Sequence, residues 1–181
     1  MKEHKTPEDL ITLIQISDLH IRNGRLYRQL NSIEVTNKLI NQISEGGIYD
    51  YCILTGDLVD PCSSDNYVEL LPVLTKLQSF CKNVCVTAGN HDNLQLMKQI
   101  LPEDILFPPF VADIGGRYIA SVNAIYESEN PRFPENEMSI LKNKLIKPKP
   151  VTIFSHHHVK QIGVPKLDAE MVSNFQNFRI Y

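Results

Sequence analysis

Histidines, aspartates and one asparagine cluster directly after apolar runs of this sequence. "DLH" follows "LITLIQIS", "GDLVD" follows "YDYCILT", "GNHD" follows "NVCVTA", and "HHH" follows "PVTIFS". Of the six histidines, only His4 lies outside these motifs. Carboxylate, amide and imidazole groups without a thiolate fit Mn, Fe or Zn better than Ca or Mg. The pattern therefore predicts chemistry that depends on divalent metal ions.

Each motif alone also has an ordinary structural explanation. "DLH" is compatible with a turn and an exposed histidine, and Asp60 with a turn residue or a helix N-cap. Gly89 and Asn90 are residue types that accept a positive φ in a loop. The triplet 156–158 is compatible with a solvated loop or an internal scrap of affinity tag. What favours a single site is the recurrence of such motifs after successive strands.

Strand-like and helical segments alternate along the chain. We expect strands over residues 10–17, 49–56, 83–89, 117–124 and 150–155, and one more beginning at 178. We expect helices before Gly46-Gly47, from about 65, and over 94–101, 135–145 and 168–175, with residues 130–137 as a surface loop. In the second helix we expect Val68, Leu71, Leu74 and Leu77 to share one face. This alternation predicts an α/β fold, in which ligands bind at the carboxyl ends of the strands.

Composition narrows the class of protein further. The chain has 181 residues, 43% of them hydrophobic and 22% charged, which fits a single globular domain over residues 1–181. A net charge of −3 gives no basic footprint, so a nucleic-acid partner is not expected. We find no secretory signal and no membrane span in the sequence. The four cysteines have no C-x-x-C spacing, and without a secretion signal we expect reduced thiols and a cytoplasmic location.

The ligand set is large enough for two ions. A carboxylate has two oxygens, so one aspartate can bridge two ions about 3.5–4 Å apart, an arrangement used in phosphoryl transfer. Such a pair polarises phosphoryl oxygens and lowers the pKa of a water between the ions. A histidine that is not a ligand can protonate the departing alkoxide. We therefore expect two divalent ions, Mn, Fe or Zn, as cofactors.

Taken in order, the four motifs resemble those of the calcineurin-like metallophosphoesterase superfamily, and especially those of the bacterial class III cyclic-nucleotide phosphodiesterases. The resemblance runs from about residue 11 to the end of the chain. It implies a four-layer α/β/β/α sandwich and a metal-dependent phosphodiesterase. The roles it implies are Asp18 and His20 as ligands of one ion, Asp57 as the bridge, Asn90 and His156 as ligands of the second ion, His91 as the general acid, and Asp92 as the residue that orients it.

Within that superfamily the substrate expected from the sequence is a cyclic nucleotide or a similar small phosphodiester. Pro61 and Cys62 stand where serine/threonine phosphatases carry arginine and glycine, so that branch does not fit. A nuclease of the same superfamily is an alternative, although the chain has neither room for a DNA-binding cap nor a basic surface. Arg22, Arg25 and Arg28 are candidates to meet a phosphate or a base, or else belong to a solvated loop.

One departure from the family pattern keeps another class of function open. The resemblance implies a later Gly-His-x-His motif, but no histidine follows His158. The chain is then expected to be a C-terminally truncated fold, or else a degenerate homologue that serves as a non-catalytic binding or regulatory module. The intact ligand positions and His91 favour the enzyme. A sheet edge left exposed by a lost strand would make an oligomer possible.

Overall fold

Two three-stranded β-sheets form the centre of the computed structural model, which describes residues 10–23, 30–126 and 130–177. The first sheet contains β1 (Leu13–Ile16), β2 (Tyr49–Thr55) and β3 (Cys81–Thr87), all parallel and in that order. The second contains β4 (Phe110–Asp113), β5 (Tyr118–Ser121) and β6 (Val151–Phe154). In it, β5 pairs antiparallel with β4 and parallel with β6.

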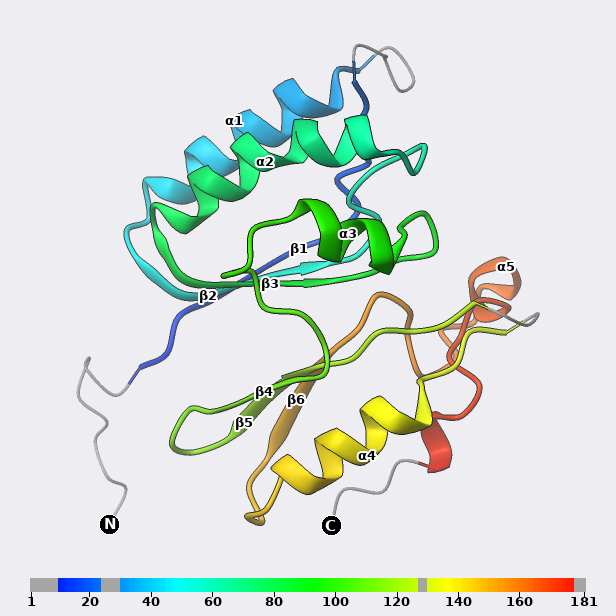
Figure 1. Ribbon diagram of the computed structural model, residues 1–181. Helices are drawn as coiled ribbons and strands as arrows, with labels where there is room; N and C mark the ends of the chain where they lie inside the picture. Colours follow the sequence, from blue (N-terminus) through cyan, green and yellow to red (C-terminus); the bar gives the residue numbers. More distant parts are fainter. Residues whose placement is uncertain (1–9, 24–29, 127–129, 178–181) are drawn as a thin grey trace.

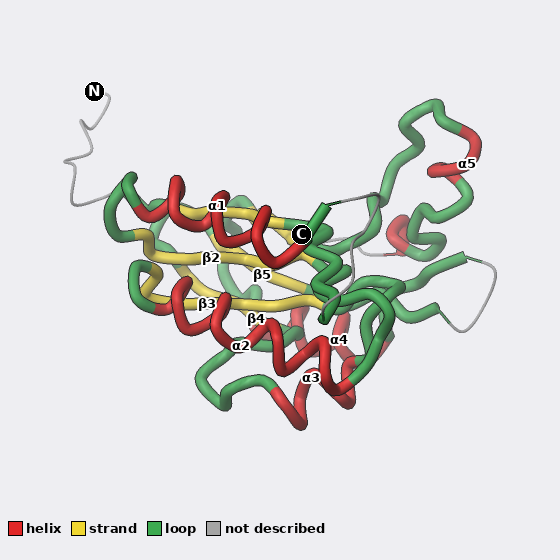
Figure 2. Tube along the Cα trace, turned by 90° about the horizontal axis from the view of Figure 1, so that it is seen from above, coloured by secondary structure: helices red, strands yellow, loops and turns green. Residues whose placement is uncertain are grey.

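Helices cover the outer face of each sheet. Helices α1 (Ser32–Ser44) and α2 (Ser64–Gln78) lie over the first sheet, and α4 (Glu135–Lys144) lies beneath the second (Figure 1). Figure 2 shows α1 and α2 from above, running along the strands that they cover. The remaining helices are α3 (Leu94–Ile100), α5 (Pro165–Asp168) and a 3-10 turn (Phe175–Asn177). This arrangement confirms the predicted four-layer α/β/β/α sandwich.

The core reflects the apolar character of the parallel strands. The C-terminal halves of β2 and β3 are buried without alternation, as expected for strands that are covered on both faces. One cluster packs the inner sides of α1 and α2 against the first sheet, and a smaller one packs α4 against the second. None of the helices in the described ranges is long and apolar enough to cross a membrane.

Side-chain caps determine where the helices begin. Asn31 accepts hydrogen bonds from the backbone N–H groups of the first turn of α1, and Asn93 does the same for α3. Ser63 caps α2 by accepting from the N–H of Asn66. The interpretation of Asp60 as a helix N-cap is therefore wrong, and its side chain is available for another role.

The structure corrects several expectations about elements. Residues 168–175 do not form one helix, and residues 130–137 are not simply a surface loop, because Phe133 is 1% exposed and α4 begins at Glu135. The short strand β4 was not predicted. The strand expected from residue 178 lies outside the described residues.

The buried face of α2 agrees with the prediction at Leu74 and Leu77 but not at Val68. Val68 is 53% exposed, whereas Tyr67, Leu70, Leu74 and Leu77 are fully buried. These four positions are spaced three, four and three residues apart, which keeps them on one side of a helix of 3.6 residues per turn. The sequence pattern misled because both faces of α2 carry aliphatic side chains.

Two alanine variants of α2 test this packing. We expect Leu70→Ala to lower the free energy of unfolding by about 2–5 kcal/mol, because it leaves a cavity in the core. Val68→Ala, on the exposed side of the same helix, should change it by less than about 0.5 kcal/mol. Urea denaturation followed by circular dichroism measures both. Equal losses in the two variants would contradict the orientation of α2.

Candidate metal centre

The loops after β1 and β2 are held in unusual backbone conformations and are joined to each other. Among the described residues, the non-glycine positions with positive φ are Asp18 (59°), His20 (43°) and Asp57 (52°). The N–H of Asp18 donates to Gly56 O at 3.1 Å, and the N–H of His20 donates to Asp57 O at 2.9 Å. Such conformations are costly for residues with a Cβ and tend to cluster at functional sites. The cost is borne here at three of the predicted metal ligands.

The loop after β3 approaches Asp57 closely because its second residue is a glycine. A Cβ on Gly89 would collide with Oδ1 and the backbone N of Asp57. In the same loop, the backbone N–H of His91 donates to Asp57 Oδ1 at 3.0 Å. Gly56 has a similar role, since a Cβ there would lie 2.7 Å from His156 Nδ1. Both positions need glycine because a side chain there would collide with neighbouring atoms.

The first group of converging side chains contains Asp18, His20 and Asp57. His20 Nε2 lies 3.7 Å from Asp18 Oδ1 and 3.6 Å from Asp57 Oδ2. These separations are too long for hydrogen bonds and close to those of atoms that share an ion at about 2.0–2.2 Å. The ligand atoms of the three residues all lie within 4.8 Å of one another. This group fits a divalent cation.

The second group contains Asp57, Asn90 and His156. His156 Nε2 lies 3.5 Å from Asp57 Oδ1 and 3.2 Å from Asn90 Oδ1. On the other side of the ring, Nδ1 lies 2.7 Å from the carbonyl oxygen of Thr55, which can only accept. Nδ1 of His156 therefore donates this hydrogen bond, and an unprotonated Nε2 would present its lone pair to the two oxygens. Three electron-rich atoms in contact also fit a cation.

Asp57 connects the two groups. Its Oδ2 faces His20 and its Oδ1 faces His156, and the residue is only 4% exposed. A buried carboxylate is costly unless positive charge or hydrogen-bond donors lie nearby, and two divalent ions would supply that charge. The donor chemistry and the geometry of both groups therefore suit two divalent ions with Asp57 between them.

The histidine triplet divides into different environments. The ring of His157 is buried, packs edge-on against Tyr126, and places Nε2 3.3 Å from Asn90 Oδ1. Burial, followed by the neighbouring His156, lowers the pKa of His157, so this ring remains neutral. His158 Nε2 instead lies 3.7 Å from Asp168. Within the triplet, the contact with Asp57 recorded in the structure is that of His156.

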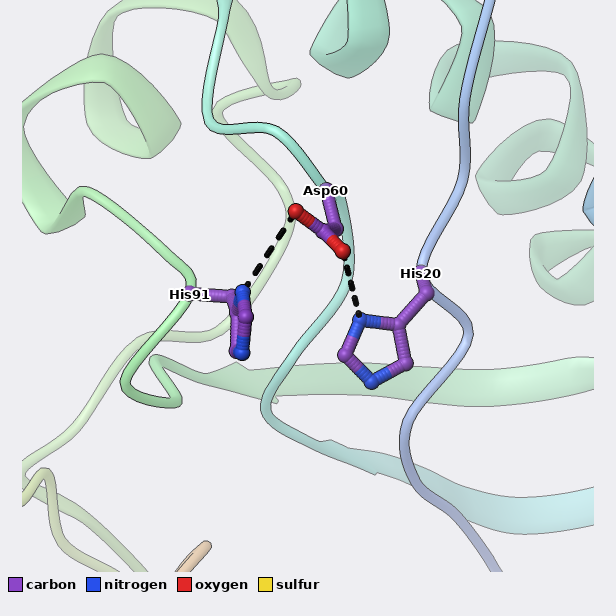
Figure 3. A group of neighbouring side chains, drawn as sticks. All are labelled: His20, Asp60 and His91. Atoms are coloured by element: carbon purple, nitrogen blue, oxygen red, sulfur yellow. Dashed lines mark ion pairs between the residues drawn. The ribbon is translucent and has the colours of Figure 1, made fainter. Parts of the chain in front are cut away.

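A third group lies beside the first and has a different character (Figure 3). The carboxylate of Asp60 points between two histidines, with Oδ1 3.5 Å from His91 Nδ1 and Oδ2 3.9 Å from His20 Nδ1. These atoms are close enough for a metal, but the guanidinium of Arg22 is also hydrogen-bonded to Asp60 Oδ2. A cation already compensates this carboxylate, so the geometry suits orientation of the imidazoles better than metal binding.

Asp92 faces away from this group. Its carboxylate accepts hydrogen bonds from the backbone N–H of Leu58 at 3.1 Å and of Gly89 at 2.9 Å, and from the hydroxyl of Tyr67 at 3.1 Å. Burial raises its pKa, which these hydrogen bonds partly offset. Asp92 therefore fastens the loop after β3 to the loop after β2. The structure places Asp60, and not Asp92, beside the ring of His91.

The sequence singled out most of these residues but missed two contributions. Asp60 was noticed in "GDLVD" without a catalytic interpretation, although its position three residues after Asp57 was the available signal. Nothing in the sequence indicated that Tyr67, on α2, would bond to Asp92. Of the three arginines considered as phosphate ligands, Arg22 is engaged by Asp60, and Arg25 and Arg28 lie outside the described residues.

Comparisons with known proteins indicate the family of the chain. Residues 11–178 match the model of the calcineurin-like phosphoesterase family. A protein of Coxiella burnetii named as a probable cyclic nucleotide phosphodiesterase is 29% identical over 175 residues, which are 94% of this chain and 69% of that protein. One of Vesicomyosocius okutanii with the same designation is 30% identical, over 75% of this chain and 53% of its own length. The 3',5'-cyclic adenosine monophosphate phosphodiesterase CpdA of Haemophilus influenzae is 25% identical, over 94% of this chain and 64% of its own length.

Two isosteric variants separate the bridge from its neighbour. Asp57→Asn should weaken the binding of both ions, because a single carboxylate is shared between the two ligand groups. Asp60→Asn should leave the number of bound ions unchanged, because Asp60 is already compensated by Arg22. Metal analysis after equilibrium dialysis against Mn²⁺ measures both. Loss of metal from the Asp60 variant with retention in the Asp57 variant would reverse the assignment.

Proposed function

The chain belongs to the calcineurin-like phosphoesterase family, and from that premise we propose that it hydrolyses a small phosphodiester with two divalent ions, Mn, Fe or Zn. The ions would be held by Asp18, His20 and Asp57 on one side and by Asp57, Asn90 and His156 on the other. The observation that carries the proposal is the placement of Asp57, whose two oxygens face one ligand group each.

The chemistry divides between the ions and the protein. Divalent ions in these positions would polarise the phosphoryl oxygens and lower the pKa of a coordinated water. The protein must then supply a proton to the alkoxide that leaves as the ester bond breaks. His91 is suited to this step because its side chain is 43% exposed and is not needed as a ligand in either group.

Asp60 and Arg22 prepare His91 for that role. Asp60 lies against Nδ1 of His91, which leaves Nε2 of the ring for the leaving group. A carboxylate in this position fixes the plane of the ring. Arg22 holds Asp60 from the opposite side. We therefore assign to Asp60 the orienting role that the resemblance assigned to Asp92.

A cyclic nucleotide is the substrate that best fits the surroundings of the site. The named relatives support this class. In addition, a cavity of about 270 Å³ next to Asp18 and His20 has an apolar side formed by Leu30, Val35 and Leu39. An apolar pocket beside a phosphate-binding centre can accommodate the organic part of the ester. The cytoplasmic location and the oligomeric state remain predictions.

Replacing His91 tests the general acid. With Mn²⁺ and bis(p-nitrophenyl) phosphate, His91→Ala should lower kcat by about 10²–10⁴-fold, the usual contribution of general acid–base catalysis. Mn²⁺ content should stay near that of the unmodified protein, since His91 is not assigned as a ligand. Unchanged kcat would remove His91 from the mechanism, and a parallel loss of metal would make it a ligand instead.

The apolar cavity gives a test of substrate class. Val35→Ser should raise KM for 3',5'-cyclic AMP by about three- to ten-fold with little change in kcat, because it removes apolar contact from the organic part of the substrate. Lys38→Ala, at an exposed position of the same helix, is the matched control and should leave KM unchanged. An unaltered KM in the Val35 variant would mean that the substrate does not enter this cavity.

A further inference from the structure

A buried pair of polar side chains joins the second sheet to α4. Asn123 is 2% exposed and Glu137 is 7% exposed. The backbone N–H of Asn123 donates to Glu137 Oε2 at 2.9 Å, and the amide Nδ2 of Asn123 donates to Glu137 Oε1 at 3.1 Å. Both carboxylate oxygens thus accept from the same residue. Such a two-point contact fixes the orientation of the Asn123 side chain as well as its position.

That orientation has a consequence on the other side of the amide. With Nδ2 held by Glu137, Oδ1 of Asn123 accepts from the backbone N–H of Ala88 at 2.9 Å. Ala88 lies between the end of β3 and Gly89, so the bond crosses from the second sheet to the first. It reaches the chain two residues before Asn90. A shift of Ala88 must displace Gly89 and Asn90, which lie against Asp57 and His156.

Asn123 also lies next to a hydrogen bond with β6, the strand that precedes His156. It follows Val122, whose N–H donates to Phe154 O at 3.0 Å and so extends the pairing of β5 with β6. His156 comes two residues after Phe154. Asn123 is therefore hydrogen-bonded to the start of the loop that supplies Asn90 and sits one residue from the pairing that positions His156.

We propose that Asn123 and Glu137 are positioning residues that set the distance between the two sheets at the second ion. They touch neither the ion nor the substrate. The pair holds Ala88 at a fixed distance from β5, and through it the amide of Asn90 opposite the imidazole of His156. This inference deepens the proposed function by naming the part of the fold that maintains one half of the metal centre.

Single isosteric variants should break the pair without changing its size. Glu137→Gln replaces one acceptor by a donor, and turning over either amide only moves the conflict to the N–H of Asn123 or of Ala88. Asn123→Asp keeps the acceptor for Ala88 but sets a second carboxylate against Glu137. At pH 8 each variant should weaken Mn²⁺ binding at the second site by about ten-fold, within the range known for outer-shell partners of ligands.

The double variant, Asn123→Asp with Glu137→Gln, should restore what each single variant loses. The new aspartate can accept from Ala88 and from the new glutamine, whose carbonyl accepts from the N–H of residue 123. We expect Mn²⁺ affinity within about three-fold of the unmodified protein, as the double-mutant cycle of a directly coupled pair requires. Glu135→Gln and Asn136→Asp, at exposed positions of the same helix, are matched controls and should have no effect.

Two readouts separate this proposal from the proposed function. Calorimetric titration with Mn²⁺ requires no substrate, and amide hydrogen exchange of residues 88–91 in the metal-free protein requires no ion. Exchange should be faster in both single variants and normal in the double variant. Unchanged affinity and exchange in the single variants would overturn the proposal, as would a folded double variant as impaired as the single ones. If a single variant does not fold, a folded double variant with full affinity supports it, and one with weakened affinity refutes it.

Discussion

The carboxylate of Asp57 is the constraint on which the rest of the site depends. It is almost fully buried, yet its two oxygens face different groups of ligands. A buried anion is costly unless positive charge or hydrogen-bond donors surround it. The N–H of His91 donates to one of these oxygens, and His20 and His156 lie beside the carboxylate on its two sides. Divalent ions between these groups would supply the positive charge that the buried carboxylate needs.

Holding Asp57 in place requires local strain and close backbone contact. Positive φ at Asp18, His20 and Asp57 aims these side chains at one point, and Gly89 allows the third loop to approach. Hydrogen bonds between the loops offset this strain, and Asp92 adds two more by accepting from the N–H groups of Leu58 and Gly89. The loops at the end of the first sheet thus carry most of the proposed ligands. The second sheet brings His156, which must be aligned across the sandwich.

The sequence predicted the fold and the position of the motifs well because both depend on local pattern. Apolar strands followed by polar residues specify which side chains reach the same edge of a sheet, and the four-layer sandwich is confirmed. Contacts between elements were harder to predict. The predicted face of α2 was right at Leu74 and Leu77 but wrong at Val68, because Val68 and Leu70 are equally apolar in the sequence. The role of Asp60 depends on Arg22, 38 residues earlier in the chain, and no spacing rule connects the two. Asn123 and Glu137 are ordinary polar residues until the packing of α4 buries them.

Two ions on opposite sides of Asp57 are the central claim, and anomalous diffraction from crystals grown with Mn²⁺ tests it most directly. Data collected at the manganese absorption edge should show two peaks about 3.5–4 Å apart, one beside Asp18 and His20 and the other beside Asn90 and His156. The carboxylate of Asp57 should lie between them. A single peak, or peaks beside His158 and Asp168 instead, would contradict the account.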